Sequence, residues 1–173
     1  MSQDPDHTSA QPTLDQAARQ IRHYGLTADP QSVLVMVRLM AAGARLGQAA
    51  EAHFGRFGLS TGRYRLLADL EDCGGEKSPS QLAAGLGVSR ATVTGLVDGL
   101  ERDGLVARRP SREDGRASVV VLTARGAQRL REMAPEHFRR LEAVVGGLTE
   151  AERGTFLELL ERIARGIGEL TAE

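Results

Sequence analysis

The chain is poor in the residues that several kinds of functional site require. It has one cysteine, Cys73, and no tryptophan, and aromatic residues make up 3% of its 173 residues. A single cysteine excludes an intrachain disulfide framework, a cysteine-based zinc finger and CxxC redox chemistry. So few aromatic side chains argue against an aromatic cage or a stacking platform. The candidate functional groups are therefore mainly hydroxyl and charged side chains.

Long apolar runs and an excess of one charge are also absent. The longest uninterrupted aliphatic run, Val33–Val37, is too short to span a bilayer, and residues 1–12 are polar and acidic, unlike a signal peptide. The 22 Lys and Arg residues nearly balance the 23 Asp and Glu residues. We therefore expect a cytoplasmic protein with no membrane partner. Any binding to nucleic acid has to come from a local basic patch.

We recognise no catalytic or metal-site pattern. The sequence has no HExxH motif and no glycine-rich phosphate loop, and its four histidines are scattered. We therefore expect no enzymatic activity, no bound metal and no cofactor.

Capping signals divide the chain into helices. We expect a disordered tail over residues 1–12, and helices over about 14–25, 30–57, 61–73, 79–86, 90–103, 124–146 and from 150 onward. The predicted caps include three reciprocal capping boxes that begin at Thr13, Ser78 and Thr149. Pro135 is expected to kink the helix in which it lies. Residues 105–109 and 117–122 are typical of two strands joined by a turn-rich tip.

The C-terminal segment carries a coiled-coil-like stripe. Its apolar residues recur at spacings of 4, 3, 4 and 3, at Phe156, Leu160, Ile163, Ile167 and Leu170. This is the spacing of an a/d seam, which predicts pairing with a second copy. The alternative is an ordinary intramolecular core.

The order helix, glycine turn, capped helix and hairpin is that of a winged helix-turn-helix. In such a motif the second helix enters the major groove of DNA with its N-terminal residues, and arginines at the hairpin tip reach the minor groove. Residues 105–116 hold four arginines against two acidic residues, a small local excess of positive charge. The fold class is therefore mainly α with a small antiparallel β-wing.

The central segment resembles the MarR family of bacterial transcriptional regulators. The residues that carry the resemblance are Leu82–Thr94, Leu100–Val106, the triplet Asp114-Gly115-Arg116 and Val119–Thr123. The resemblance implies a homodimer that binds a pseudo-palindromic DNA operator. It also implies dimerisation helices over 13–57 and 124–173 around a DNA-binding domain over 58–123, with residues 13–24 as an extension beyond the common core.

The predicted DNA-binding residues are hydroxyl and arginine side chains of the helix-turn-helix and wing: Arg65, Ser78, Ser80, Ser89, Arg90, Thr92, Thr94, Arg112 and Arg116. Asp114 is expected to orient the wing through one of Arg108, Arg109 or Arg116. Gly95 stands where many relatives carry a larger, often basic residue, which predicts a missing contact. Ser78 and Ser80 could instead only cap or flank the helix that they begin.

The resemblance also implies a small aromatic or anionic effector, for which Arg45, His53 and Arg63 are the candidate anchors. The plain alternative is that they are partly exposed helix residues. Some relatives sense peroxide with a cysteine in the N-terminal helical region. Cys73 lies elsewhere and has no second cysteine with which to form a disulfide, so we expect it to be inert.

The predicted function is a sequence-specific DNA-binding regulator, most often a repressor in this family. The alternative is a winged helix that binds protein and not DNA, which the near-neutral charge favours.

Overall fold

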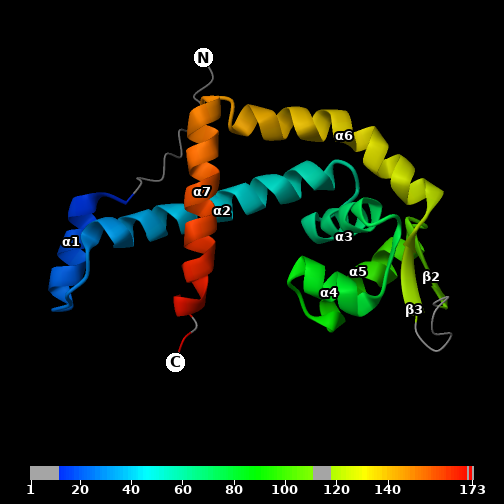
Figure 1. Cartoon of the computed structure of the whole chain (residues 1–173), viewed down its shortest axis with the longest axis horizontal. Helices are drawn as coiled ribbons and strands as arrows, with labels where there is room; N and C mark the ends of the chain where they lie inside the picture. Colours follow the sequence, from blue (N-terminus) through cyan, green and yellow to red (C-terminus); the bar gives the residue numbers. More distant parts are fainter. Residues whose placement is uncertain (1–11, 111–117, 171, 173) are drawn as a thin grey trace, which may run out of the picture. The chain divides into compact units, whose positions relative to one another are not determined.

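The computed structural model describes residues 12–110, 118–170 and 172. The predicted disordered tail, apart from Pro12, lies outside them. The chain divides into two compact units, Met1–Tyr64 and Arg65–Glu173. Figure 1 shows the helices and strands of both units in chain order. The boundary falls inside α3 (Thr61–Asp72). The division into dimerisation and DNA-binding segments stays a prediction.

The first unit consists of α1 (Leu14–His23), α2 (Pro30–Gly55) and the start of α3. The predicted capping box at Thr13 is confirmed, and the Asp29 carboxylate accepts hydrogen bonds from two backbone N–H groups at the start of α2. α1 packs against α2, with Ala17 buried. The Arg38 guanidinium fixes the chain ahead of α1, because its Nε and Nη2 donate to the Pro12 carbonyl at 3.2 and 3.0 Å.

α2 leaves much of its apolar surface uncovered within this unit. Val35, Met40 and Leu46 are 49%, 65% and 57% exposed. Within the described residues, α2 alone is long and apolar enough to cross a membrane. The length of the uninterrupted aliphatic run underestimates the length of this apolar helix. Alanines and glycines interrupt the run, but they keep the helix apolar. A core helix of a soluble protein meets the same criterion.

The second unit contains the winged helix-turn-helix and the C-terminal helices. After α3 come β1 (Glu76–Lys77), α4 (Pro79–Leu86), α5 (Arg90–Arg102), β2 (Val106–Pro110) and β3 (Ser118–Leu122). They are followed by α6 (Ala124–Val144), which continues through Pro135, by α7 (Glu150–Gly166) and by a 3-10 turn (Ile167–Leu170). The predicted mainly helical fold with a small antiparallel sheet is confirmed.

The sheet has one strand more than the predicted hairpin. β1 pairs antiparallel with β3, so the strand order is β1-β3-β2. The sequence does not predict this strand, since a segment of two residues shows no alternation of apolar and polar side chains. The Leu122 N–H donates to the Gly75 carbonyl at 2.8 Å and extends this contact.

The core of the second unit is aliphatic. Its fully buried side chains come from α3, α4, α5, the sheet and α6, and include Leu66, Leu67, Leu70, Leu82, Val93, Val97, Leu100, Val106, Val120 and Met133. Burying each such side chain stabilises the fold by about 1.5–3 kcal/mol. The apolar face of α5 thus holds this helix in place and leaves its other face free.

α6 begins where the chain leaves the sheet. The Thr123 hydroxyl accepts a hydrogen bond from the Gly126 N–H at 3.0 Å and lies 2.8 Å from the Gly104 carbonyl, to which it donates. Gly126 approaches the sheet so closely that a Cβ there would lie 2.2 Å from the Leu105 carbonyl oxygen. The start of α6 is therefore fixed against the base of the wing.

The C-terminal stripe is largely uncovered in the described structure: Phe156, Ile167 and Leu170 are exposed, and Leu160 and Ile163 are half-buried. α7 contains no buried residue, and Phe156 is 46% exposed. This disfavours the interpretation of the stripe as an intramolecular core. The last two positions, Ile167 and Leu170, lie in the 3-10 turn, where the spacing of an α-helical seam no longer applies.

Candidate DNA-binding surface

α4 and α5 form the predicted helix-turn-helix, and capping residues mark the start of each helix. Ser78 and Gln81 exchange the two hydrogen bonds of a capping box, and Gly87 closes α4 with a left-handed φ of 67°. The Ser89 hydroxyl accepts from the Thr92 N–H at 3.1 Å and begins α5. Two helices are thus joined by a short turn, and the buried face of α5 packs on α4.

The opposite face of α5 is open to solvent. Its exposed residues are Arg90, Ala91, Thr92, Thr94, Gly95 and Asp98. At Gly95 the surface is bare, with no atom within 4 Å of where a Cβ would stand. The helix therefore offers a face of small and polar side chains with room for close approach.

The hydroxyl groups on this face are already hydrogen-bonded within the helix. Thr94 Oγ1 donates to the Arg90 carbonyl at 3.0 Å, and the Ser89 and Thr92 hydroxyls lie 2.8 Å apart. Thr94 therefore has its methyl group and oxygen lone pairs left for DNA. The Arg90 side chain is exposed and has no hydrogen bond or ion pair within residues 12–110 and 118–170.

The three predicted DNA-binding residues on α3 and at the start of α4 differ in how far their side chains are already hydrogen-bonded. Arg65 Nη2 donates to the Leu86 carbonyl at 3.1 Å, so this arginine caps the end of α4. The Ser78 hydroxyl is engaged in its capping box, whereas Ser80 is exposed.

Two arginines of β2 form ion pairs with acidic residues outside the wing tip. Arg108 pairs with Asp98 and Glu101 of α5, and Arg109 pairs with Glu76 of β1. The hydrogen bond from the Arg108 backbone N–H lowers the pKa of the Glu101 carboxyl. Arg112, Asp114 and Arg116 lie outside the described residues. Their roles therefore stay predictions, as does the choice of partner for Asp114.

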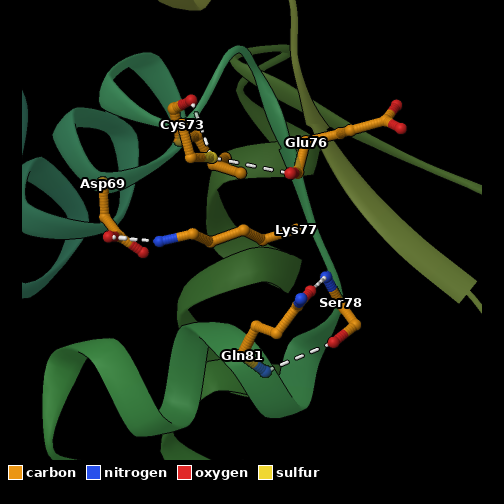
Figure 2. A network of polar contacts seen from close by, with 7 residues as sticks. Asp69, Cys73, Glu76, Lys77, Ser78 and Gln81 are labelled. Carbon is orange, nitrogen blue, oxygen red and sulfur yellow. Dashed lines mark hydrogen bonds and ion pairs between the residues drawn. The ribbon is translucent and has the colours of Figure 1, made fainter.

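Between α3 and α4 lies a network of polar contacts (Figure 2). Lys77 extends from β1 toward Asp69 of α3, with 2.6 Å between Nζ and Oδ1, and this hydrogen bond raises the pKa of the lysine. The exposed Cys73 directs its thiol toward the Leu70 and Glu76 carbonyls, at 3.2 and 3.5 Å. The thiol thus interacts weakly with the backbone at the end of α3.

Cys73→Ser is expected to leave both DNA affinity and its response to peroxide unchanged, because a hydroxyl can make the same contacts to the two carbonyls. Titrating a DNA probe with each protein, with and without peroxide, checks this. A peroxide-dependent release of DNA by the native protein that the variant lacks would contradict it.

The three candidate effector residues lie on α2 and α3, and each has different surroundings. Arg45 lines an open hollow on α2 together with Ala42, Leu46, Gln48 and Ala49. His53 Nδ1 lies 3.0 Å from Arg56 Nη2, and its ring meets Phe57 edge-on at 5.5 Å. The Arg63 N–H donates to Ser60 at the start of α3.

The expectation that the sequence contains no catalytic pattern needs one correction. Residues 58–62 read Gly-Leu-Ser-Thr-Gly, which matches the GxSxG string of serine hydrolases. In those enzymes the serine lies on a turn from strand to helix. Here Ser60 lies between α2 and α3, and its hydroxyl accepts from the Arg63 N–H at 3.2 Å. The string is therefore a helix start and not a nucleophile elbow.

Comparison with known proteins agrees with this geometry. The model of the MarR family matches residues 57–117. The transcriptional repressor YetL of Bacillus subtilis is 35% identical over 133 residues, which are 76% of this chain and 80% of the relative.

Solved structures share the fold. Sco3205 of Streptomyces coelicolor, a MarR family regulator solved in complex with DNA, is 27% identical with a TM-score of 0.73, over 82% of this chain and 89% of the other. BpsR of Bordetella bronchiseptica, whose DNA binding is regulated by 6-hydroxynicotinic acid, is 26% identical with a TM-score of 0.62, over 72% and 91%. The helix-turn-helix, its wing and these relatives together show that the chain belongs to the MarR family of transcriptional regulators.

Proposed function

We propose that the protein is a transcriptional repressor that binds a pseudo-palindromic operator as a homodimer. α5 enters the major groove of each half-site, and the wing reaches the neighbouring minor groove. The observation that carries this is the open face of α5, with Arg90, Thr94 and Gly95 exposed on a helix whose other face is buried. The DNA complex of Sco3205 supports the same use of the fold. The comparisons give no support to a protein-binding module.

A gel-shift titration with the DNA upstream of the protein's own gene tests this function. We expect a discrete complex that survives an excess of unrelated duplex, because base contacts from α5 add to phosphate contacts. Binding that unrelated duplex removes completely would contradict specific recognition. No binding at all would favour the protein-binding alternative.

The homodimer is proposed because each unit carries uncovered apolar surface. In the first unit these residues include Val35 and Met40, and in the second they include Phe156 and Leu157. Large exposed apolar patches in soluble proteins mark interfaces. A second copy of the chain would cover them and set the two α5 helices about one turn of DNA apart.

The protein is therefore expected to sediment as a dimer at micromolar concentration. Phe156→Glu should shift it toward the monomer, because a carboxylate would have to be buried in the interface. Analytical ultracentrifugation measures both species. Native protein sedimenting only at about the 18.6 kDa of one chain would contradict the dimer.

We further propose a cytoplasmic location and an effector that is a small aromatic or anionic compound. The regulation of BpsR by an aromatic acid supports this class. Arg45 supplies a cation at the hollow of α2, and His53 and Arg63 are the other candidate anchors.

A further inference from the structure

The guanidinium of Arg108 connects the wing to the helix proposed to read DNA. Nη1 lies 2.5 Å from Glu101 Oε2, and Nη2 lies 2.5 Å from Asp98 Oδ1. The Arg108 backbone N–H also donates to Glu101 Oε1 at 2.9 Å. One residue of β2 therefore makes three contacts with two acidic residues of α5.

The register of the sheet explains why Arg108 faces α5. In the antiparallel pair, Arg108 lies opposite Val120, and Val106 lies two residues before it on the same face. Val106 and Val120 are both buried. Arg108 thus lies at the edge of the buried face of the wing, and its side chain is 34% exposed.

The two acidic residues occupy a position where negative charge is unfavourable for a DNA-binding protein. Asp98 follows Thr94 by four residues and Ala91 by seven, so the three lie along one side of α5. All three are exposed. An unpaired carboxylate on this side would repel the phosphates of a bound duplex.

Stability does not account for this arrangement. The side chains of Asp98 and Glu101 are 51% and 38% exposed, and ion pairs between exposed side chains contribute little to the free energy of unfolding. The geometry of the three side chains instead fixes the wing relative to α5. The planar guanidinium fixes both partners at once, which a lysine ammonium could not do in the same way.

We propose that Arg108 is a positioning residue that aligns the wing with α5 and masks Asp98 and Glu101 from the phosphates of DNA. It acts through these two carboxylates and not by contacting DNA. This inference rests on the proposed DNA-binding function, and it adds residues that the sequence analysis did not place on the DNA-binding surface.

The test measures DNA affinity by fluorescence anisotropy for Arg108→Gln in two backgrounds. One is the native chain, and the other carries Asp98→Asn and Glu101→Gln, which keep the size of both side chains. In the native background we expect an affinity loss of about tenfold, within the range for residues of one ion-pair network. In the second background the same substitution should change affinity by less than about twofold, because nothing is left to mask or align.

Arg102→Gln is the matched control. It removes the same charge from an exposed arginine at the end of α5. Its effect on DNA affinity should be equal in both backgrounds. Thermal melting of each variant checks folding, and the melting temperatures should agree within a few degrees.

Two results for Arg108→Gln would overturn the proposal. An equal affinity loss in both backgrounds would overturn the proposal, since Arg108 would then contact phosphate directly. An unchanged affinity of Arg108→Gln in the native background would overturn it as well. If the native protein itself binds no DNA, the proposed function fails, and this is seen before any variant is compared.

Discussion

Arg116→Ala is expected to weaken binding to the operator and to unrelated duplexes alike, by about tenfold to a hundredfold. An arginine in the minor groove acts mainly through charge, and this groove distinguishes base pairs poorly. The size corresponds to the loss of one charge-assisted hydrogen bond. The logarithm of affinity should also fall less steeply with the logarithm of salt concentration, by about one unit of slope.

Substitutions on α5 provide the matched comparison. Arg90→Ala and Thr94→Ala should change the preference at particular base pairs, by about 1–3 kcal/mol where a good contact is lost. For Thr94 the contact is expected to come from its methyl group or lone pairs, because its hydroxyl proton is bonded to the Arg90 carbonyl.

Affinity and salt dependence have to be measured for all three variants on operator and unrelated DNA. If Arg116→Ala retains the native affinity and slope, the wing does not contact DNA. A loss confined to single base pairs would assign Arg116 to base recognition.

Gly126→Ala is expected to lower the free energy of unfolding by about 1–3 kcal/mol or more, the cost of overpacking a filled site. The added Cβ would lie 2.2 Å from the Leu105 carbonyl oxygen and 2.7 Å from Leu122 Cδ1. The first of these atoms is backbone and cannot rotate away. The gain in helix propensity of about 1 kcal/mol from replacing glycine is too small to offset this.

Gly154→Ala is the control for that substitution. Gly154 also lies within a helix, α7, but nothing stands within 4 Å of its Cβ position. This variant should be more stable than the native protein by about 0.5–1 kcal/mol. Urea unfolding followed by circular dichroism measures both, and equal effects would show that Gly126 is not a close-packing site.

Local signals in the sequence predicted most of the fold. The capping boxes at Thr13, Ser78 and Thr149 are all confirmed, because each depends on residues only three positions apart. Such features need no knowledge of distant parts of the chain.

What the sequence did not reveal depends on residues far apart. β1 exists because β3, more than forty residues later, provides its partner. The hydrogen bond from Arg65 to the Leu86 carbonyl joins residues 21 positions apart. The pairing of Arg108 with Asp98 and Glu101 follows from the docking of the sheet on α5. Tertiary packing decides each of these contacts.

The most direct test of the account is a selection of binding sites from fragmented genomic DNA with the purified native protein. We expect enrichment of one two-fold symmetric sequence, with half-sites about 10 base pairs apart, the separation that places two recognition helices on one face of the duplex. Enrichment of no sequence, or of an asymmetric single site, would contradict a dimer that recognises DNA through α5.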